Sequence, residues 1–153
     1  MSLARCVKRA HTLVNMRYIA IIAVGTLFAG CKNYTITPDS LRQQLKNATP
    51  AEVRMNGPLG ETHNYRANNI HMIHCFDKNG QPAELPNGPA IESRITLANG
   101  RRKVMYFDRI ELRNDTLIGH PSRFISTMEI RIPYSQIVKI EVQNGGKRMS
   151  YGY

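Results

Sequence analysis

Apolar and polar residues alternate along much of the second half of this chain. Residues 91–97, IESRITL, place Ile91, Ile95 and Leu97 at one parity and charged or polar residues at the other. The same period of two recurs in four further groups: Val104 and Tyr106, Ile110 and Leu112, Ile130 and Ile132, and Val138, Ile140 and Val142. A period of two predicts β-strands that bury one face and expose the other, as antiparallel sheets do.

Turn-forming residues separate these segments. Glycine, proline, asparagine and aspartate cluster at residues 57–58, 77–80, 87–88, 99–100, 114–115 and 144–146. Short strands divided by turns every 8–12 residues or so are typical of all-β sandwiches and barrels. We therefore expect a mainly β fold over residues 51–153, a single antiparallel barrel or sandwich. Pro133-Tyr134-Ser135-Gln136 is the exception, and we expect one 3₁₀ turn there before the last strand.

A short amphipathic helix is predicted before the strands, over residues 37–50. Thr37 can cap its first turn, and Pro38 suits the first helical position because its missing N–H would have no partner there. Pro50 ends it. The apolar stripe of this helix consists of Leu41, Leu45 and Ala48. We expect the stripe to pack on the β domain rather than on a partner.

The N-terminal part contains an apolar run without charge, residues 18–29, YIAIIAVGTLFA, which follows basic residues. Twelve residues are too few for a helix that crosses a bilayer, which needs about 20. A basic start, a short apolar run and small residues at its end are the layout of a secretory signal peptide. We expect residues 1–30 to be such a peptide. Met16 alone would begin a compact signal, so residues 1–15 look like an upstream extension and Met16 like the true start.

The end of this run, Leu27-Phe28-Ala29-Gly30-Cys31, resembles the lipobox of bacterial lipoproteins. The resemblance implies cleavage between Gly30 and Cys31 and palmitate-type acyl chains on Cys31. Phe28 departs from the usual aliphatic residue but keeps its bulk. Residues 31–36 are then a lipidated cysteine and tether, and the protein is anchored in the cell envelope, in the outer membrane facing the periplasm. The alternative is an uncleaved signal anchor with an incidental cysteine.

Two further resemblances concern the remaining chain. The order of strands and turns over residues 102–143 resembles a small SH3-like barrel, as in enterobacterial lipoproteins of the YgdI/YgdR type. The segments RNDTLIGH, IPYSQIVKIEVQNGG and GETHNYRAN resemble small Bacteroidetes lipoproteins. In that group Asp-Ser/Thr-aliphatic tripeptides accept O-glycans. The resemblance therefore implies two acceptors, Thr116 in Asp115-Thr116-Leu117 and Ser40 in Asp39-Ser40-Leu41.

The charge of the chain is strongly positive. Lysine and arginine number 21 against 11 aspartate and glutamate, and the formal net charge is +10. Arg101, Arg102 and Lys103 are candidates for contact with an anionic surface: anionic lipid, lipopolysaccharide or an envelope protein. The group could extend as a basic stripe through Arg109, Arg113, Arg123 and Arg131. A plain solvated face is the alternative, and no nucleic-acid partner is expected for an exported chain.

Four acidic residues fall on the polar side of the predicted strands. We expect each to pair with a neighbouring lysine or arginine; they are Glu92, Glu111, Glu129 and Glu141.

No motif predicts a catalytic, metal or cofactor site. His71, His74 and Cys75 are close in sequence, but on a strand His74 faces away from the other two, and no second pair completes a zinc site. The chain carries neither a glycine-rich phosphate loop nor a G-x-S-x-G motif. After loss of Cys6 and lipidation of Cys31, we expect Cys75 to be a buried small hydrophobe, and the alternative is a disulfide to another molecule.

The function expected from the sequence is therefore that of a non-catalytic envelope lipoprotein, a binding or assembly module on the membrane, with no cofactor. The alternative from another class is a small envelope hydrolase whose site is assembled from distant residues.

Overall fold

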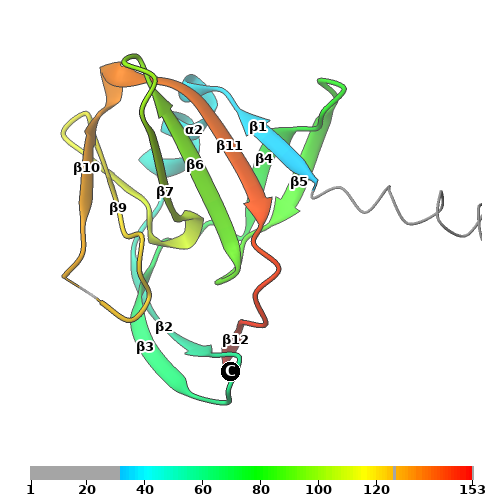
Figure 1. The fold of residues 1–153 in the computed structure, drawn as a ribbon, viewed down its shortest axis with the longest axis vertical. Helices are drawn as coiled ribbons and strands as arrows, with labels where there is room; N and C mark the ends of the chain where they lie inside the picture. Colours follow the sequence, from blue (N-terminus) through cyan, green and yellow to red (C-terminus); the bar gives the residue numbers. More distant parts are fainter. Residues whose placement is uncertain (1–31, 126, 153) are drawn as a thin grey trace, which may run out of the picture. The chain divides into compact units, whose positions relative to one another are not determined.

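The computed structural model describes residues 32–125 and 127–152 (Figure 1). The elements follow one another as β1 (Asn33–Ile36), α2 (Pro38–Lys46), β2 (Ala51–Asn56), β3 (Thr62–Ala67), β4 (Met72–Phe76), β5 (Pro82–Pro86), β6 (Ile91–Leu97), β7 (Arg102–Tyr106), the 3₁₀ turn η1 (Phe107–Arg109), β8 (Glu111–Arg113), β9 (Thr116–Gly119), β10 (Ile130–Pro133), the 3₁₀ turn η2 (Tyr134–Gln136), β11 (Ile137–Asn144) and β12 (Ser150–Gly152).

The strands form three antiparallel sheets. The largest has six strands in the order β5-β4-β1-β11-β6-β7, and two smaller ones have the orders β10-β9-β8 and β12-β2-β3. The mainly β, antiparallel fold with one short helix is confirmed, and so is the 3₁₀ turn at Tyr134. The sheets do not close into a barrel, so the SH3-like barrel expected in the C-terminal part is wrong. A sandwich-like class is consistent with the observed sheets.

The segment expected to be a tether is partly a strand. Asn33–Ile36 forms β1, which lies inside the six-stranded sheet between β4 and β11. It pairs with β11 from Asn33↔Gln143 to Ile36↔Ile140. Ile36 is buried in the core, and the burial of this apolar side chain stabilises the pairing of the short segment with the sheet. The lipidation residue Cys31 lies outside the described residues.

The helix begins as its sequence predicts and ends earlier. The Thr37 side chain accepts a hydrogen bond from the backbone N–H of Ser40 at 3.2 Å. Leu41 and Leu45 are buried, but α2 ends at Lys46, so Ala48 lies beyond it. The Gln44 amide donates to the carbonyl of His74 and accepts from its N–H, both at 3.0 Å. It therefore supplies β4 with the backbone partners that β1 does not provide there.

The predicted alternation is confirmed in β6, where buried and half-buried residues alternate without a break. In β11 the register shifts between Ile137 and Lys139. This irregularity turns Val138 outward, with 56% of its surface exposed, and buries Ile137 instead. Val138 was therefore wrongly expected in the core. Val104 of β7, which the alternation also places in the core, is 46% exposed instead.

Lys32–Tyr153 forms a compact unit with its own hydrophobic core. The core lies between the six-stranded sheet, α2 and the β8–β10 sheet, and includes Leu41, Ile73, Phe107, Leu117 and Ile140. A unit with its own core can fold alone, so residues 32–153 are suited to experiments in solution. Among the helices of the described residues, none is long and apolar enough to cross a membrane.

A pair of adjacent substitutions tests the register of β11. Ile140 is fully buried, whereas the neighbouring Lys139 is exposed and forms an ion pair with Glu141. Ile140→Asp should lower the free energy of unfolding by about 3–5 kcal/mol, because it buries an unpaired charge. Lys139→Asp should cost about 1 kcal/mol or less. Thermal melts of both variants check this, and equal shifts in Tm would contradict the register.

Candidate functional site

A buried ion pair lies where β3, η1, β12 and the β9–β10 loop meet. Arg123 donates to both carboxylate oxygens of Asp108, at 2.7 and 3.2 Å. The two side chains are 1% and 0% exposed. The hydroxyl groups of Tyr65 and Tyr151 also donate to Asp108, at 2.5 and 3.1 Å. Asp108 is therefore saturated with donors, as a buried carboxylate must be.

Aromatic rings enclose the Arg123 guanidinium. Its central carbon lies 3.9 Å from the centre of the Tyr106 ring and 5.0 Å from that of Tyr65. Such cation–π contacts are strongest away from water. Burial and the neighbouring Asp108 raise the pKa values of Tyr65 and Tyr151, so both stay protonated and act as donors.

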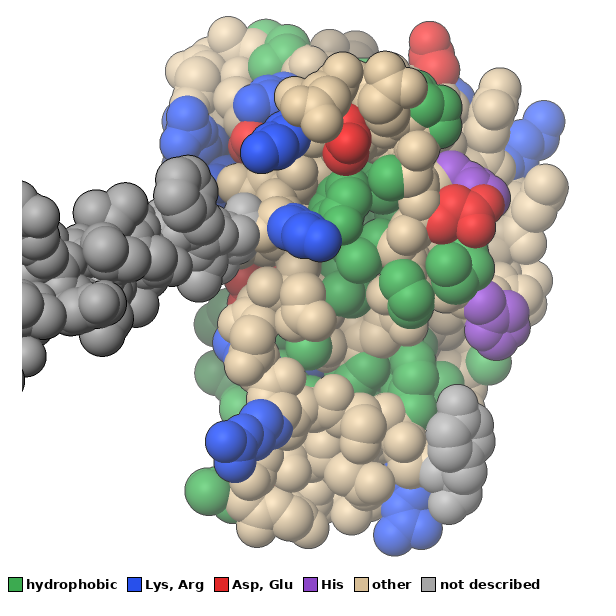
Figure 2. Space-filling view, turned by 90° about the vertical axis from the view of Figure 1, so that its right-hand side faces the viewer, with side chains coloured by type: hydrophobic (Ala, Val, Ile, Leu, Met, Phe, Trp, Pro, Cys, Tyr) green, Lys and Arg blue, Asp and Glu red, His purple; other side chains and the backbone are tan. Residues whose placement is uncertain are grey.

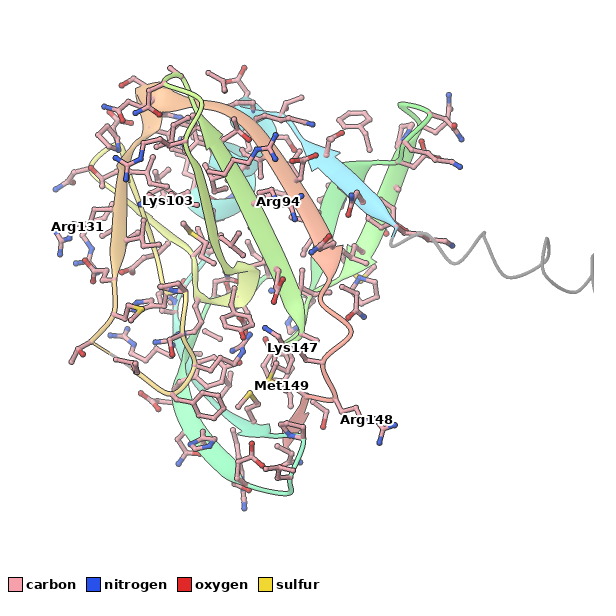
Figure 3. All side chains as sticks on the ribbon, in the orientation of Figure 1. Arg94, Lys103, Arg131, Lys147, Arg148 and Met149 are labelled. Carbon is pink, nitrogen blue, oxygen red and sulfur yellow. The ribbon has the colours of Figure 1, made fainter. Side chains whose placement is uncertain are left out.

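Lys147 of the β11–β12 segment closes one side of this cluster. Its ammonium group donates to the Tyr106 hydroxyl at 2.7 Å and to Glu92 at 2.6 Å. Burial alone would lower the pKa of Lys147, but these hydrogen bonds outweigh it and raise the pKa. The label in Figure 3 marks it at the point where this segment passes the start of β6.

A second buried arginine lies beside this pair without a carboxylate of its own. Arg109 is 8% exposed, and its described hydrogen bond runs from Nη1 to the carbonyl of Ser122 at 2.5 Å. Within residues 32–125 and 127–152, no aspartate or glutamate forms an ion pair with it. Its Nε is buried without a hydrogen-bond partner. Burial lowers the pKa of Arg109, and the nearby Arg123 lowers it further.

The buried charges of the described residues therefore do not balance. They comprise Asp108, Arg109 and Arg123, one negative and two positive groups. The ion pair with Arg123 uses the carboxylate, so the charge of Arg109 is left over. An uncompensated buried charge is costly, and the usual remedy is a counterion or a hydrogen-bond acceptor.

Arg109 lines a cavity of about 190 Å³ between the end of β3, η1 and β8. Arg66 and Arg113 bring two more positive charges to its wall, and His120 lines it as well. The negative groups in the wall are Asp108, bound to Arg123, and Glu111, bound to Arg113 at 2.8 Å. The complete lining is Pro50, Arg66, Ala67, Asn68, Asp108, Arg109, Ile110, Glu111, Arg113 and His120.

Asn68 fixes the position of η1 in this cavity wall. Its backbone N–H donates to the carbonyl of Asp108 at 2.7 Å, and its side-chain amide donates to the carbonyls of Phe107 and Ile110. The 3₁₀ turn can therefore place Asp108 and Arg109, which are adjacent in sequence, into different electrostatic surroundings. The chemistry of the cavity is that of a site for a carboxylate or phosphate group, because a guanidinium binds either with paired hydrogen bonds.

The basic residues singled out in the sequence do not form a single stripe. Arg109 and Arg123 are buried, which a stripe on a solvated face does not allow. Arg101 and Arg102 are exposed at the start of β7, and Lys103 is half-buried. Figure 3 shows Arg131 on β10 pointing outward, away from Arg148 in the β11–β12 segment. Each of the four glutamates pairs with a lysine or arginine. Three of the partners are two residues away, in Glu111 with Arg113, Glu129 with Arg131 and Glu141 with Lys139, as expected of neighbours, whereas Glu92 pairs with the distant Lys147.

The histidine and cysteine residues in and just before β4 are not brought together. His71 and His74 are exposed, and His74 pairs with Glu84 at 3.2 Å. Cys75 is buried and donates to the carbonyl of Ala83 at 3.3 Å. Burial and the nearby Glu84 raise the pKa of its thiol, so it is not an activated nucleophile. In the described part of the chain, no three His, Cys, Asp or Glu side chains are placed to hold a metal ion.

A second depression lies on the β4–β5 face. It has a volume of about 330 Å³ and is lined by residues that include Ser40, Cys75 and Glu84. Figure 2 shows hydrophobic side chains across the middle of this face and histidines beside a carboxylate at one border. It is wider and more open than the Arg109 cavity, and no buried unpaired charge lines it. The Arg109 cavity is therefore the better candidate site.

The two predicted glycan acceptors lie in different settings. Thr116 is half-buried at the start of β9, directly after a turn in which Asn114 and Asp115 have positive φ. Ser40 lies in α2, where its hydroxyl accepts a hydrogen bond from Gln44. Glycosylation therefore stays a prediction for both. Gly30 and Cys31 lie outside the described residues.

The cavity is not predictable from the sequence, because nothing local shows that Arg109 is buried. One local sign of its burial is the run Phe107 to Ile110, where two charged residues stand between apolar ones and the alternation of the strands is broken. Compared with known proteins, the chain matches no family model, no curated protein and no solved structure.

Proposed function

We propose that this chain is a non-catalytic, lipid-anchored envelope protein that binds a small anion, bearing a carboxylate or a phosphate group, in the cavity lined by Arg109. The observation that carries the proposal is the excess positive charge of the buried residues. Two guanidinium groups and one carboxylate are buried together, and Arg109, the arginine without a carboxylate partner, is one of the residues that line a cavity. A bound anion would supply the missing charge.

The surroundings of the cavity support an anion rather than a cation. Arg66 is solvent-exposed and adds to the positive potential of the cavity wall, whereas the charge of Arg113 is offset by its ion pair with Glu111. Both acidic groups in its wall are already held by arginines. A concave site with an excess of one sign of charge attracts ligands of the opposite sign from a distance.

Membrane anchoring forms the second part of the proposal. It rests on the lipobox resemblance of residues 27–31 and on the short apolar run before it. Acyl chains on Cys31 would hold the binding domain at the membrane surface, because two or more chains anchor stably where one does so reversibly. The partner of the domain is then the membrane, and its ligand an anion present in the envelope.

The anion site can be tested with phosphate and acetate as probes. Each should raise the Tm of residues 32–153 in proportion to the logarithm of its concentration, because a ligand that binds only the folded state stabilises it. Arg109→Met should abolish this increase. In buffer without these anions, the variant should unfold within about 1 kcal/mol of wild type, since the substitution removes a buried unpaired charge together with one hydrogen bond.

The matched control is Arg123→Met, which removes the arginine that is paired. It should lower the free energy of unfolding by about 3–5 kcal/mol by leaving Asp108 buried without its partner. Chloride at equal ionic strength controls for screening. If phosphate and acetate leave the Tm of wild type unchanged, or shift wild type and Arg109→Met equally, the anion site is refuted.

Anchoring can be tested by metabolic labelling with an alkyne fatty acid in a host that processes lipoproteins. The full chain should take up the label, and Cys31→Ser should not, because serine cannot form the thioether. Cys75→Ala should leave the label unchanged. Label that persists on Cys31→Ser, or is missing from the wild type, would show that the segment is a plain signal or anchor.

A further inference from the structure

We infer that the ligand of the Arg109 cavity is a single-chain anionic amphiphile. Its head group enters the cavity, and its hydrocarbon chain lies on an apolar patch formed by Phe124, Ile125 and Met128. This inference rests on the proposed function, because it names the class of the anion that the cavity binds.

The patch consists of large hydrophobic side chains that face solvent. Phe124 is 68% exposed, Ile125 50% and Met128 43%. Exposed hydrophobic residues that occur singly are normal, whereas a group of them indicates a binding surface. All three belong to the segment between β9 and β10, and we assign their exposed surface to the hydrocarbon chain of the ligand.

The segment that carries the patch is hydrogen-bonded to two residues that line the cavity. His120 lines the cavity, and its Nδ1 is hydrogen-bonded to the carbonyl of Met128 at 3.0 Å. Arg109 donates to the carbonyl of Ser122, whose hydroxyl accepts from the N–H groups of Phe124 and Ile125 at 3.2 and 3.1 Å. Two residues of the cavity wall thus contact this segment, Arg109 at Ser122 and His120 at Met128.

Phe124, the most exposed residue of the patch, is held in place before any ligand binds. Arg123, which directly precedes Phe124, is fixed in the buried ion pair with Asp108. The ring of Phe124 meets the ring of His63 edge to face, with centres 5.4 Å apart. A binding surface that is ordered in advance loses little conformational entropy on binding.

The cavity is large enough for the head group of such an amphiphile but not for its hydrocarbon chain. Its volume of about 190 Å³ is smaller than the roughly 300–1,000 Å³ of pockets that enclose a whole drug-sized ligand. A carboxylate or phosphate group fits in such a space, but a long hydrocarbon chain does not. The chain must therefore leave the cavity, and the neighbouring apolar patch is the surface on which it can be removed from water.

The inference predicts that affinity rises with chain length. Acetate, octanoate, decanoate and dodecanoate, each kept below its micelle concentration, are titrated against residues 32–153, with alkyl phosphates of the same lengths in parallel. From octanoate to dodecanoate the Kd should fall at least tenfold, because each methylene removed from water tightens binding by up to about fourfold. Decanol, which has the chain without the charge, should bind at least tenfold more weakly than decanoate.

Surface variants keep the test independent of folding defects. Phe124→Ser combined with Ile125→Ser should reduce the dependence on chain length to less than threefold and leave the binding of acetate or inorganic phosphate unchanged. Leu59→Ser is the control, because Leu59 is 93% exposed but lies in the β2–β3 turn. It should behave as wild type.

The possible outcomes distinguish the amphiphile from the anion site itself. If small anions bind and chain length has no effect, the amphiphile is refuted while the anion site stands. If no anion binds at all, the proposed function fails as well. A dimer of the wild type that the double variant abolishes, without any effect of chain length, would show that a second copy covers the patch and would overturn the inference.

Discussion

The buried ion pair between Asp108 and Arg123 is the contact on which the remaining architecture depends. It joins η1 to the β9–β10 segment, and through the hydroxyl groups of Tyr65 and Tyr151 it reaches β3 and the C-terminal strand β12. Elements from different sheets thus meet on one carboxylate. Because both charges are out of water, neither can be removed alone without leaving the other buried and unpaired.

The same pair determines the character of the neighbouring cavity. Asp108 has its oxygens committed to Arg123 and two tyrosines, and it forms no ion pair with Arg109, although the two residues are adjacent in sequence. Asn68 enforces this separation by holding the backbone of the 3₁₀ turn. A structural ion pair in this protein therefore leaves a second buried cation without a carboxylate partner.

Local sequence predicted those parts of the fold that depend on local rules. The strict alternation of β6, the Thr37 cap and the 3₁₀ turn at Tyr134 each follow from neighbouring residues. Val138 was misplaced because a one-residue irregularity in β11 reverses parity without changing the composition of the strand. The strand at Asn33–Ile36 was missed because four residues carry too little pattern, and their pairing partners lie about a hundred residues further along.

The candidate site was less predictable for a related reason. The partners of Asp108 lie 15 and 43 residues away, so its burial follows from tertiary contacts alone. Arg109 and Arg123 consequently looked like members of a solvated group of arginines.

The position of β1 has a mechanical consequence for a chain anchored at Cys31. Asn33, two residues after that cysteine, is already paired with β11 inside the largest sheet. A pull on the membrane anchor would load the hydrogen bonds of an interior strand in shear, rather than stretch a slack linker. A protease would likewise find almost no extended chain to cut between the lipid and the sheet. Release from the envelope would then require the domain itself to open.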